Sequence, residues 1–201
     1  MLVLVLAADM NLGIGRNNGL PWSFAKDMKF FKNVTQQSTV IIGSGTWAGL
    51  EAKGNRLPGR DIIILSNKET PRLNLVPNGS EQYTNAAKLV IGGNRDTHKV
   101  AFVIGGSQIY REFADAADYA IVTRIHAEHE CDAHLDTRIM YRFSEEILNY
   151  DITDTDRLTQ NGVKLSFTLY GSRYRAANKP IPPSVLAAYE RGVNSVKGWF
   201  D

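Results

Sequence analysis

The sequence lacks the features that mark secreted and membrane-spanning proteins. It contains one cysteine, Cys131, in 201 residues, so no disulfide can form within the chain, and such a free thiol is typical of a reducing compartment. The longest apolar run, Met1 to Ala8, is too short to cross a bilayer, and no basic segment precedes it. These absences predict a cytoplasmic protein without a membrane partner.

A large excess of charge of either sign is missing as well. The chain has 23 Lys and Arg residues and 21 Asp and Glu residues, and the resulting net charge of +2 does not indicate a nucleic-acid partner. With 43% hydrophobic and 22% charged residues, the composition is that of an ordinary globular protein. A chain of this length fits one domain with a sizeable core.

Short apolar runs alternate with helical patterns along most of the chain. Strands are expected at 2–8, 39–42, 61–65, 100–104 and 119–123, and helices at 26–34, 46–51, 80–90 and 108–114. This alternation predicts an α/β fold with a mostly parallel central sheet flanked by helices. Residues 143–151 and 164–173 alternate polar and apolar side chains with no helix between them, which predicts a closing C-terminal antiparallel hairpin.

Residues 176–201 look like an extension to a domain that spans residues 1–175. The Lys179–Pro183 segment is typical of a stiff polyproline linker, and Ser184 is placed to cap a short helix through Arg191. The apolar residues of the extension are Val185, Leu186, Tyr189, Val193, Trp199 and Phe200. They are too many for a solvated tail, so we expect either a helix docked on its own domain or a contact with another copy or partner.

Asp27 is a carboxylate on the apolar side of a predicted helix. Phe24, Met28 and Phe31 recur at helical spacing, and Asp27 lies on the same stripe. A carboxylate that faces an apolar interior must be paired, be hydrogen-bonded or take up a proton more readily than usual. It is either a ligand-holding acid or a first-turn residue that serves the amides of the helix N-terminus.

Two glycine-containing junctions join a strand to a helix, at residues 42–47 and 103–110. Such junctions let backbone amides approach a phosphate, and two on one sheet favour a dinucleotide; tight turns are the alternative, because neither has the full dinucleotide fingerprint. A long glycine-containing loop at 11–19 could fold over a ligand. By contrast, Ile91-Gly92-Gly93 is expected only to end a helix.

Two further groups of residues could bind ligands. His126, His129, Cys131 and His134 are close enough in sequence to suggest zinc, but strand alternation would split them between two faces, so we expect a polar loop and no metal. Arg60 follows a rigid turn and precedes a buried strand. It is either a bidentate partner for a carboxylate or a surface residue.

Nine short motifs then follow one another along residues 1–175. They are Ala7-Ala8, Gly13-Ile14-Gly15, Leu20-Pro21-Trp22, Asp27 with Phe31, Gly43 with Thr46-Trp47, Leu57-Pro58-Gly59-Arg60, Ile104-Gly105-Gly106-Ser107-Gln108-Ile109-Tyr110, Thr123-Arg124-Ile125 and Glu128–His134. In this order and spacing they resemble dihydrofolate reductase. The resemblance implies reduction of 7,8-dihydrofolate, with a hydride from NADPH added at C6 and a proton at N5, in support of one-carbon and thymidylate metabolism.

The resemblance also implies roles for individual residues. The catalytic set would be Asp27, Trp22, Leu20 and Thr123. The substrate-binding set would be Val5, Ala7, Asp27, Met28, Phe31, Lys32, Leu50, Leu57, Arg60, Ile104, Tyr110 and Thr123. The cofactor-binding set would be Ala7, Ile14, Gly15, Leu20, Gly43, Ser44, Gly45, Thr46, Leu65, Ser66, Asn67, Lys68, Ile104, Gly105, Gly106, Ser107, Gln108 and Ile109. The Gly105-Gly106 peptide would be cis.

The chain departs from the family pattern at Ser44 and Gly45, where many members carry basic residues that meet the phosphates of the cofactor. Ser66, Asn67 and Lys68 could meet the 2′-phosphate instead, so the preference for NADPH over NADH is expected to be weaker than usual. The extension after residue 175 is not part of the pattern; a monomer is expected, with a dimer through the extension as the alternative.

Two other functions fit parts of the pattern. A reductase of the riboflavin pathway shares the fold and NADPH but has no need for an acid after the Pro-Trp step. A non-catalytic folate- or nucleotide-binding module is the second, although Asp27, Trp22 and Thr123 together favour an enzyme.

Overall fold

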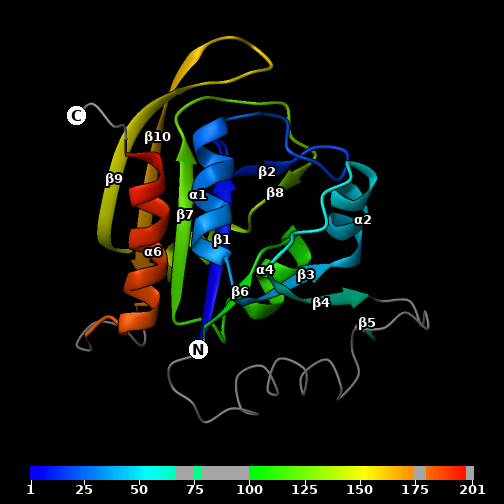
Figure 1. Cartoon of the computed structure of the whole chain (residues 1–201), viewed down its shortest axis with the longest axis vertical. Coiled ribbons are helices and arrows are strands. Elements are labelled where there is room, and N and C mark those ends of the chain that lie inside the picture. The colour runs from blue at the N-terminus through cyan, green and yellow to red at the C-terminus, as the bar shows by residue number, and fades with distance from the viewer. Residues whose placement is uncertain (67–74, 78–99, 174–179, 198–201) are drawn as a thin grey trace.

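The structure is a computed structural model that describes residues 1–66, 75–77, 100–173 and 180–197, with the backbone alone for 75–77. In these ranges an eight-stranded sheet has the order β5-β4-β3-β6-β1-β7-β10-β9 (Figure 1). Its strands are β1 (Leu2–Ala8), β3 (Thr39–Gly43), β4 (Asp61–Ser66), β5 (Leu75–Pro77), β6 (Ala101–Val103), β7 (Tyr119–Ile125), β9 (Glu145–Thr155) and β10 (Gly162–Gly171). A separate two-stranded sheet joins β2 (Gly13–Gly15) to β8 (Ala133–His134).

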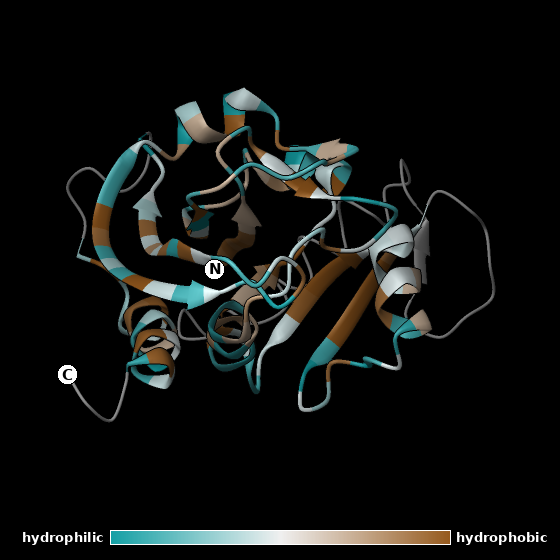
Figure 2. Cartoon of the chain, turned by 90° about the horizontal axis from the view of Figure 1, so that it is seen from above, coloured by the Kyte–Doolittle hydropathy of each residue, from teal (hydrophilic) through white to brown (hydrophobic). Residues whose placement is uncertain are grey.

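The strand directions confirm the predicted fold class. β1 pairs in parallel with β6 and β7, and the pairs β3–β6, β3–β4 and β4–β5 are parallel too. β10 is antiparallel to both β7 and β9, which is the predicted C-terminal hairpin. β9 lies at the edge of the sheet, where its residues alternate between exposed and partly buried. The same strand is banded in hydrophilic and hydrophobic colours (Figure 2). One face of β9 therefore remains wet, whereas β10 is buried from Leu165 to Gly171.

The central strand β1 is covered on both faces, as its unbroken apolar sequence predicts. Val3 and Val5 belong to one core cluster, which also contains side chains of α1 (Ala25–Thr35) and α6 (Pro183–Val196). Leu2 and Leu4 belong to a second cluster, together with side chains of α4 (Ser107–Phe113) and α5 (Thr137–Arg142). Helices thus cover both faces of the sheet, and none among the described residues is long and apolar enough to span a membrane.

The predicted elements recur with shifted ends. The helix expected at 46–51 begins earlier, as α2 (Ser44–Ala52), and the strand expected at 100–104 is shortened to Ala101–Val103. The helix expected at 80–90 and the helix end at residues 91–93 lie outside the described residues. The predicted cap at Ser184 is wrong: α6 begins at Pro183 and continues to Val196, and its N-cap, Pro182, makes no side-chain cap bond. Proline suits this first position because its missing N–H would have no partner inside the helix.

The C-terminal helix α6 packs on α1 of the same chain (Figure 1). Of the two arrangements expected for the extension, this is the helix docked on its own domain. Its buried residues are Val185, Ala188, Tyr189, Gly192, Val193 and Val196. The Tyr189 hydroxyl donates to the backbone oxygen of Phe167 at 2.7 Å, and Phe30 of α1 stacks on the Phe167 ring with centroids 4.2 Å apart. The helix thereby completes the core beside α1. Trp199 and Phe200 lie outside the described residues.

Candidate active site

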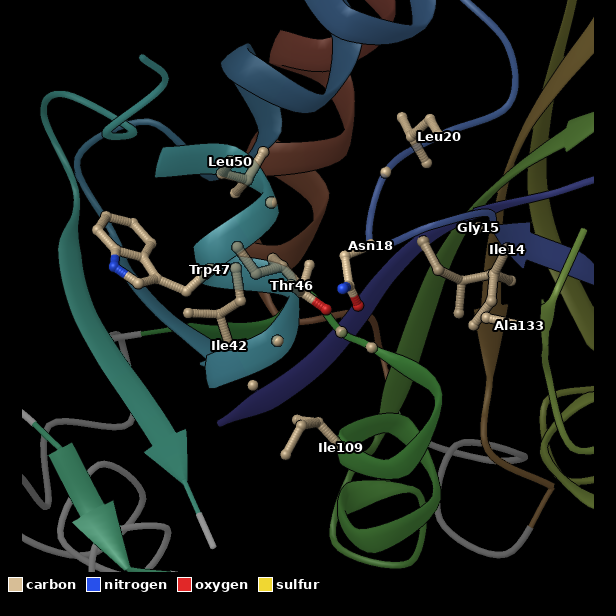
Figure 3. A pocket seen from close by; sticks show the side chains of 18 of the residues that line it. Ile14, Gly15, Asn18, Leu20, Ile42, Thr46, Trp47, Leu50, Ile109 and Ala133 are labelled. Atoms are coloured by element: carbon tan, nitrogen blue, oxygen red, sulfur yellow. The ribbon is translucent and has the colours of Figure 1, made fainter. Parts of the chain in front are cut away.

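A cleft of about 1450 Å³ opens at the end of the sheet to which the parallel strands β1 and β3 point. Its walls come from β1, the loop after it, α1, α2, residues 104–110 and Thr123 of β7. Figure 3 shows side chains of α2, α4 and the loop around Asn18 gathered about one space. Clefts at the carboxyl ends of parallel strands are where open α/β sheets bind ligands.

Most of the residues named from the sequence come together in this cleft. Those that line it are Val5, Ala7, Ile14, Gly15, Leu20, Trp22, Asp27, Met28, Phe31, Gly43, Ser44, Gly45, Thr46, Leu50, Leu57, Leu65, Ser66, Ile104, Gly105, Gly106, Ser107, Gln108, Ile109, Tyr110 and Thr123. Lys32 and Arg60 are not among the lining residues. Asn67 and Lys68 lie outside the described residues.

Asp27 is buried in the wall of the cleft, on the first turn of α1. Burial raises the pKa of its carboxyl group to about 6; the hydrogen bond with Thr123 opposes this rise, and the negative charge of Asp154 adds to it. The N-cap position belongs to Phe24, and the hydrogen bond of the Asp27 side chain is made to Thr123 of β7. A carboxyl group with this pKa can hold or release a proton near neutral pH.

The predicted apolar stripe of α1 is only partly correct. The residues of α1 that face the interior are Asp27, Phe30, Val34 and Thr35. Met28 is 44% exposed and Phe31 is half-buried; both line the cleft, and Phe31 also packs against the core cluster. The reason is that α1 packs on the sheet and on α6, which turn Phe30 and Val34 into the core.

Trp22 lies beside this acid in the chain and in the cleft. Its side chain is buried, and its indole N–H has no hydrogen-bond partner among the described residues. The ring meets that of His129 edge-on, with centroids 5.1 Å apart. A buried N–H without a partner, in a residue that lines a cleft, is suited to donate to a polar ligand group or to water.

The two glycine junctions predicted from the sequence lie against each other. The Gly43 amide donates to the backbone oxygen of Gly105 at 2.7 Å, and the Gly105-Gly106 peptide is cis, as the family resemblance implies. Gly105 has φ of +109°, which favours glycine, and a side chain at Gly106 would come within 2.9 Å of the Thr46 hydroxyl. Backbone groups of both junctions are therefore accessible at the cleft.

The loop at 11–19 is held over the cleft by contacts that the sequence did not predict. It carries β2, whose pairing with β8 fixes one end, and the Asn17 amide donates to the Asp132 carboxylate at 2.8 Å. Its tip lies on α2, because an ideal Cβ atom at Gly49 would be 1.9 Å from the backbone oxygen of Asn18. Only glycine at position 49 allows this approach.

The base of the same loop is fixed by Asp9, a buried carboxylate that sequence reasoning missed. It accepts from the amides of Asn11 at 2.9 Å, Gly13 at 2.7 Å and His129 at 2.9 Å. An aspartate directly after a buried strand and before a glycine-containing loop is a signal for such backbone bonding.

Arg60 is neither a free surface cation nor part of the cleft wall. Its guanidinium donates to the Thr35 hydroxyl at 2.9 Å and to the backbone oxygens of Pro58 and Lys32, both at 3.1 Å. It also lies over the ring of Phe31, 5.7 Å from the centroid. Because Phe31 lines the cleft, Arg60 lies directly behind this wall.

The histidines and the cysteine near residue 130 have separate partners. His126 Nε2 is 2.7 Å from the Ser166 hydroxyl, His129 Nε2 is 3.6 Å from the Asp156 carboxylate, and the Cys131 thiol is directed at Asp9. In the part of the chain that the structure describes, no three histidine, cysteine or acidic side chains form a group that could hold a metal ion.

Several lining residues were missed by the sequence analysis. They include Asn18, Gly49, Lys53, Asp132, Ala133 and Leu158. Leu158 offered a signal, since it is a large apolar residue inside the otherwise polar turn at 156–161. The others belong to a loop, a helix end and a short strand whose meeting depends on the folded chain.

Comparison with known proteins shows the family of this chain. The profile of the dihydrofolate reductase family matches residues 1–171. A bifunctional dihydrofolate reductase-thymidylate synthase of Daucus carota is 33% identical over 182 residues, which cover 83% of this chain and 33% of that protein. The dihydrofolate reductase of Bacillus subtilis is 31% identical over 140 residues, or 67% of this chain and 74% of that enzyme. The chain thus spans about a third of the length of the bifunctional relative.

A solved structure shares the fold. Dihydrofolate reductase from Enterococcus faecalis, complexed with NADP(H) and RAB-propyl, superposes with a TM-score of 0.69 at 24% sequence identity. The superposition covers 86% of this chain and 96% of that one. The extra length of the present chain includes α6, which follows the matched residues 1–171.

Proposed function

Because the chain belongs to the dihydrofolate reductase family, we propose that it reduces 7,8-dihydrofolate to 5,6,7,8-tetrahydrofolate with NADPH. The observation that carries this proposal is the buried Asp27 carboxyl in the cleft wall, with its pKa raised to about 6. When bound, NADPH supplies a hydride to C6 of the substrate, while N5 takes up a proton. Burial suits the carboxyl group for this proton chemistry near neutral pH.

Three residues would handle the pterin end of the substrate. Asp27 accepts hydrogen bonds from the amino-pyrimidine edge and favours protonation of the ring, while Thr123 orients its carboxyl group. Trp22 holds a water near the carboxylate, and its buried indole N–H supports this role because the group needs an acceptor. Leu20, 40% exposed on the loop that lies over the cleft, would close on the reacting rings.

The two glycine junctions fit the phosphates of a dinucleotide. An ideal Cβ atom at Gly43 would lie 2.9 Å from Ile109 Cγ1, so a side chain at position 43 would crowd that of Ile109. The amide groups at the start of α2, next to Gly43, face the cleft end and can donate to phosphate oxygens. Ala7 and Ile14 would flank the nicotinamide ring.

The tail of the substrate would extend along α1 and α2. Met28, Phe31, Leu50 and Leu57 supply an apolar slot for the aminobenzoyl ring. Arg60, with Lys32, would bind the glutamate carboxylate. A guanidinium has five N–H donors, and the three bonds to Thr35, Pro58 and Lys32 leave donors for a carboxylate.

The protein would work as a cytoplasmic monomer. The free thiol of Cys131 is in keeping with a reducing compartment. The apolar face of α6 packs within the same chain on Phe30 and Val34, which favours a monomer over a dimer formed through the extension.

The proposed reaction is tested by following the absorbance of NADPH with 7,8-dihydrofolate. We expect steady oxidation that depends on both components. Oxidation with an open-chain ribosylamino-pyrimidine and none with dihydrofolate would instead indicate the riboflavin-pathway reaction. Binding of dihydrofolate without any turnover would contradict the enzymatic function and favour a binding module.

Cofactor preference is expected to depend on the first turn of α2. The first turn of α2 has no acidic residue, and the last turn of α2 has no basic residue. Ser44 and Gly45 of the first turn line the cleft. Replacing Ser44 with arginine should lower KM for NADPH about tenfold, because one charge-assisted hydrogen bond to the 2′-phosphate contributes about 1.5–3 kcal/mol. KM for NADH should change little, because NADH lacks the 2′-phosphate. Ser44→Gln, similar in length but uncharged, is the control, and an equal effect of Ser44→Arg on both cofactors would contradict the prediction.

A further inference from the structure

Exposed apolar side chains are concentrated at the mouth of the cleft. Among the described residues the exposed large hydrophobic side chains are Met10, Leu20, Met28, Tyr141 and Leu158. Three of these five, Leu20, Met28 and Leu158, line the cleft, although they come from the loop after β1, from α1 and from the β9–β10 turn. Exposed apolar residues that gather at one cleft mark a binding surface for an apolar group.

Leu158 is the most exposed of these three side chains, at 64%, and it has no role in the core. It stands between polar residues, Arg157 and Thr159, in a turn where solvent-facing side chains are usually polar. Folding alone therefore gives no reason for leucine at this position, whereas a ligand in the cleft would.

The turn that presents Leu158 is fixed by a fully buried carboxylate. Asp156 is 0% exposed, and its Oδ1 atom accepts from the amides of Leu158 and Ser23, both at 3.0 Å. The Arg157 amide returns a bond to the Ser23 oxygen at 3.0 Å, and Asp156 forms an isolated β-bridge with Phe24. The Leu158 backbone is thereby joined to the segment that carries Trp22 and leads into α1.

We propose that Leu158 is a specificity-determining residue that packs, with Leu20 and Met28, on the aromatic tail of the substrate. The inference rests on the proposed function. It adds to the apolar slot between α1 and α2 a third wall, supplied by the β9–β10 turn. Met28 of α1 and Leu158 of the β9–β10 turn both line the cleft, so Leu158 would add a contact from outside α1 and α2. Leu158 discriminates dihydropterins that carry an aminobenzoyl group from those that lack it.

The test compares two substrates in the full-length protein. With 7,8-dihydrofolate, Leu158→Ala should raise KM about tenfold and leave kcat nearly unchanged, because an apolar contact made equally in ground and transition states is lost. With a 7,8-dihydropterin that has only a methyl group at C6, the same substitution should change neither constant. KM for NADPH should remain the same.

Two further variants separate the contact from general effects. Leu158→Met keeps an apolar side chain of similar volume and should restore KM for dihydrofolate to within about twofold of the wild type. Tyr141→Ala removes a side chain that is also 64% exposed but lies outside the cleft, and it should leave KM unchanged.

Three outcomes would overturn the proposal: equal loss with both substrates, a rise in KM for NADPH, or no change with dihydrofolate. Absence of turnover of either substrate by the wild type would contradict the proposed function itself. The two failures are therefore distinguishable in one set of assays. Because Leu158 is exposed, the melting temperature of Leu158→Ala should equal that of the wild type within about 1 °C.

Discussion

Replacing Asp27 with asparagine is expected to lower kcat for dihydrofolate by on the order of 10² to 10⁴-fold at pH 7, the usual contribution of a positioned acid or base. The amide keeps the size of the side chain and can still bond to Thr123, but it cannot exchange a proton near neutral pH. The loss should become smaller at low pH, where the substrate arrives already protonated. Initial rates of NADPH oxidation between pH 5 and 9 measure this effect.

The pH profile of the wild type should identify the same group. Since kcat/KM reports the ionisation of the free enzyme, it should change with an apparent pKa near 6, and this feature should vanish in Asp27→Asn. Asp154→Asn is a matched control: it removes a nearby negative charge that raises the pKa of Asp27, so the feature should move to lower pH. An unchanged profile in Asp27→Asn would assign the proton chemistry to another group.

Replacing the Asp27 carboxyl group should lower activity but raise stability relative to the wild type near neutral pH. Its pKa is about 6 in the folded protein and 3.8 in the unfolded chain, so the folded protein binds more protons between these values. The resulting contribution to the free energy of unfolding is complete below about pH 4 and is lost as pH rises through 6. It amounts to about 3 kcal/mol. Urea unfolding should therefore show the free energy of unfolding of Asp27→Asn rising relative to that of the wild type between about pH 4 and about pH 6. If the free energies of both proteins changed with pH in parallel, the burial of the charge would be contradicted.

Replacing Gly192 with valine is expected to destabilise the protein by about 2 kcal/mol. An ideal Cβ atom at Gly192 would lie 2.6 Å from both Phe30 Cε2 and Val34 Cγ2, so any side chain there forces α6 away from α1. Overpacking of this kind costs about 1–3 kcal/mol and outweighs the gain of roughly 0.5–1 kcal/mol from removing a glycine within a helix. For a chain of this size the melting temperature should fall by about 4–8 °C.

The control for Gly192→Val lies on the exposed side of the same helix. Asn194→Ala should change the free energy of unfolding by less than about 0.5 kcal/mol. Because Phe30 is three residues from Asp27 on α1, Gly192→Val should also lower activity at temperatures where the protein is still folded. A valine variant as stable as the wild type would show that the two helices do not need this close contact.

The parts of the fold that sequence predicts well are those whose signal is local. Leu2–Ala8 reads as a strand because seven apolar residues in a row have no wet face, and the structure buries both of its faces. The glycine junctions were predictable because glycine after a strand and before a helix leaves backbone groups accessible. The acid at Asp27 was conspicuous because it interrupts apolar residues.

Other features depend on partners that are distant in sequence. The phase of α1, with Phe30 inside and Met28 in the cleft, is set by the sheet and α6 on which it packs. The β2–β8 pair joins segments about 120 residues apart, and neither Gly13–Gly15 nor Ala133–His134 is long enough to be recognised as a strand by itself. The start of α6 was misplaced because a preceding proline can also serve as its N-cap.

The sequence by itself determined the α/β class, most of the strands of the main sheet, the acid at Asp27 and, through the ordered motifs, the family. These depend on periodicity, residue type and spacing, which are properties of short segments. Only the tertiary structure decided that Asp156 fixes Leu158 at the cleft, that Gly49 admits the loop at Asn18, and that Gly192 brings α6 against α1. Each of these is a close approach between distant segments, and its geometry exists only once the chain has packed.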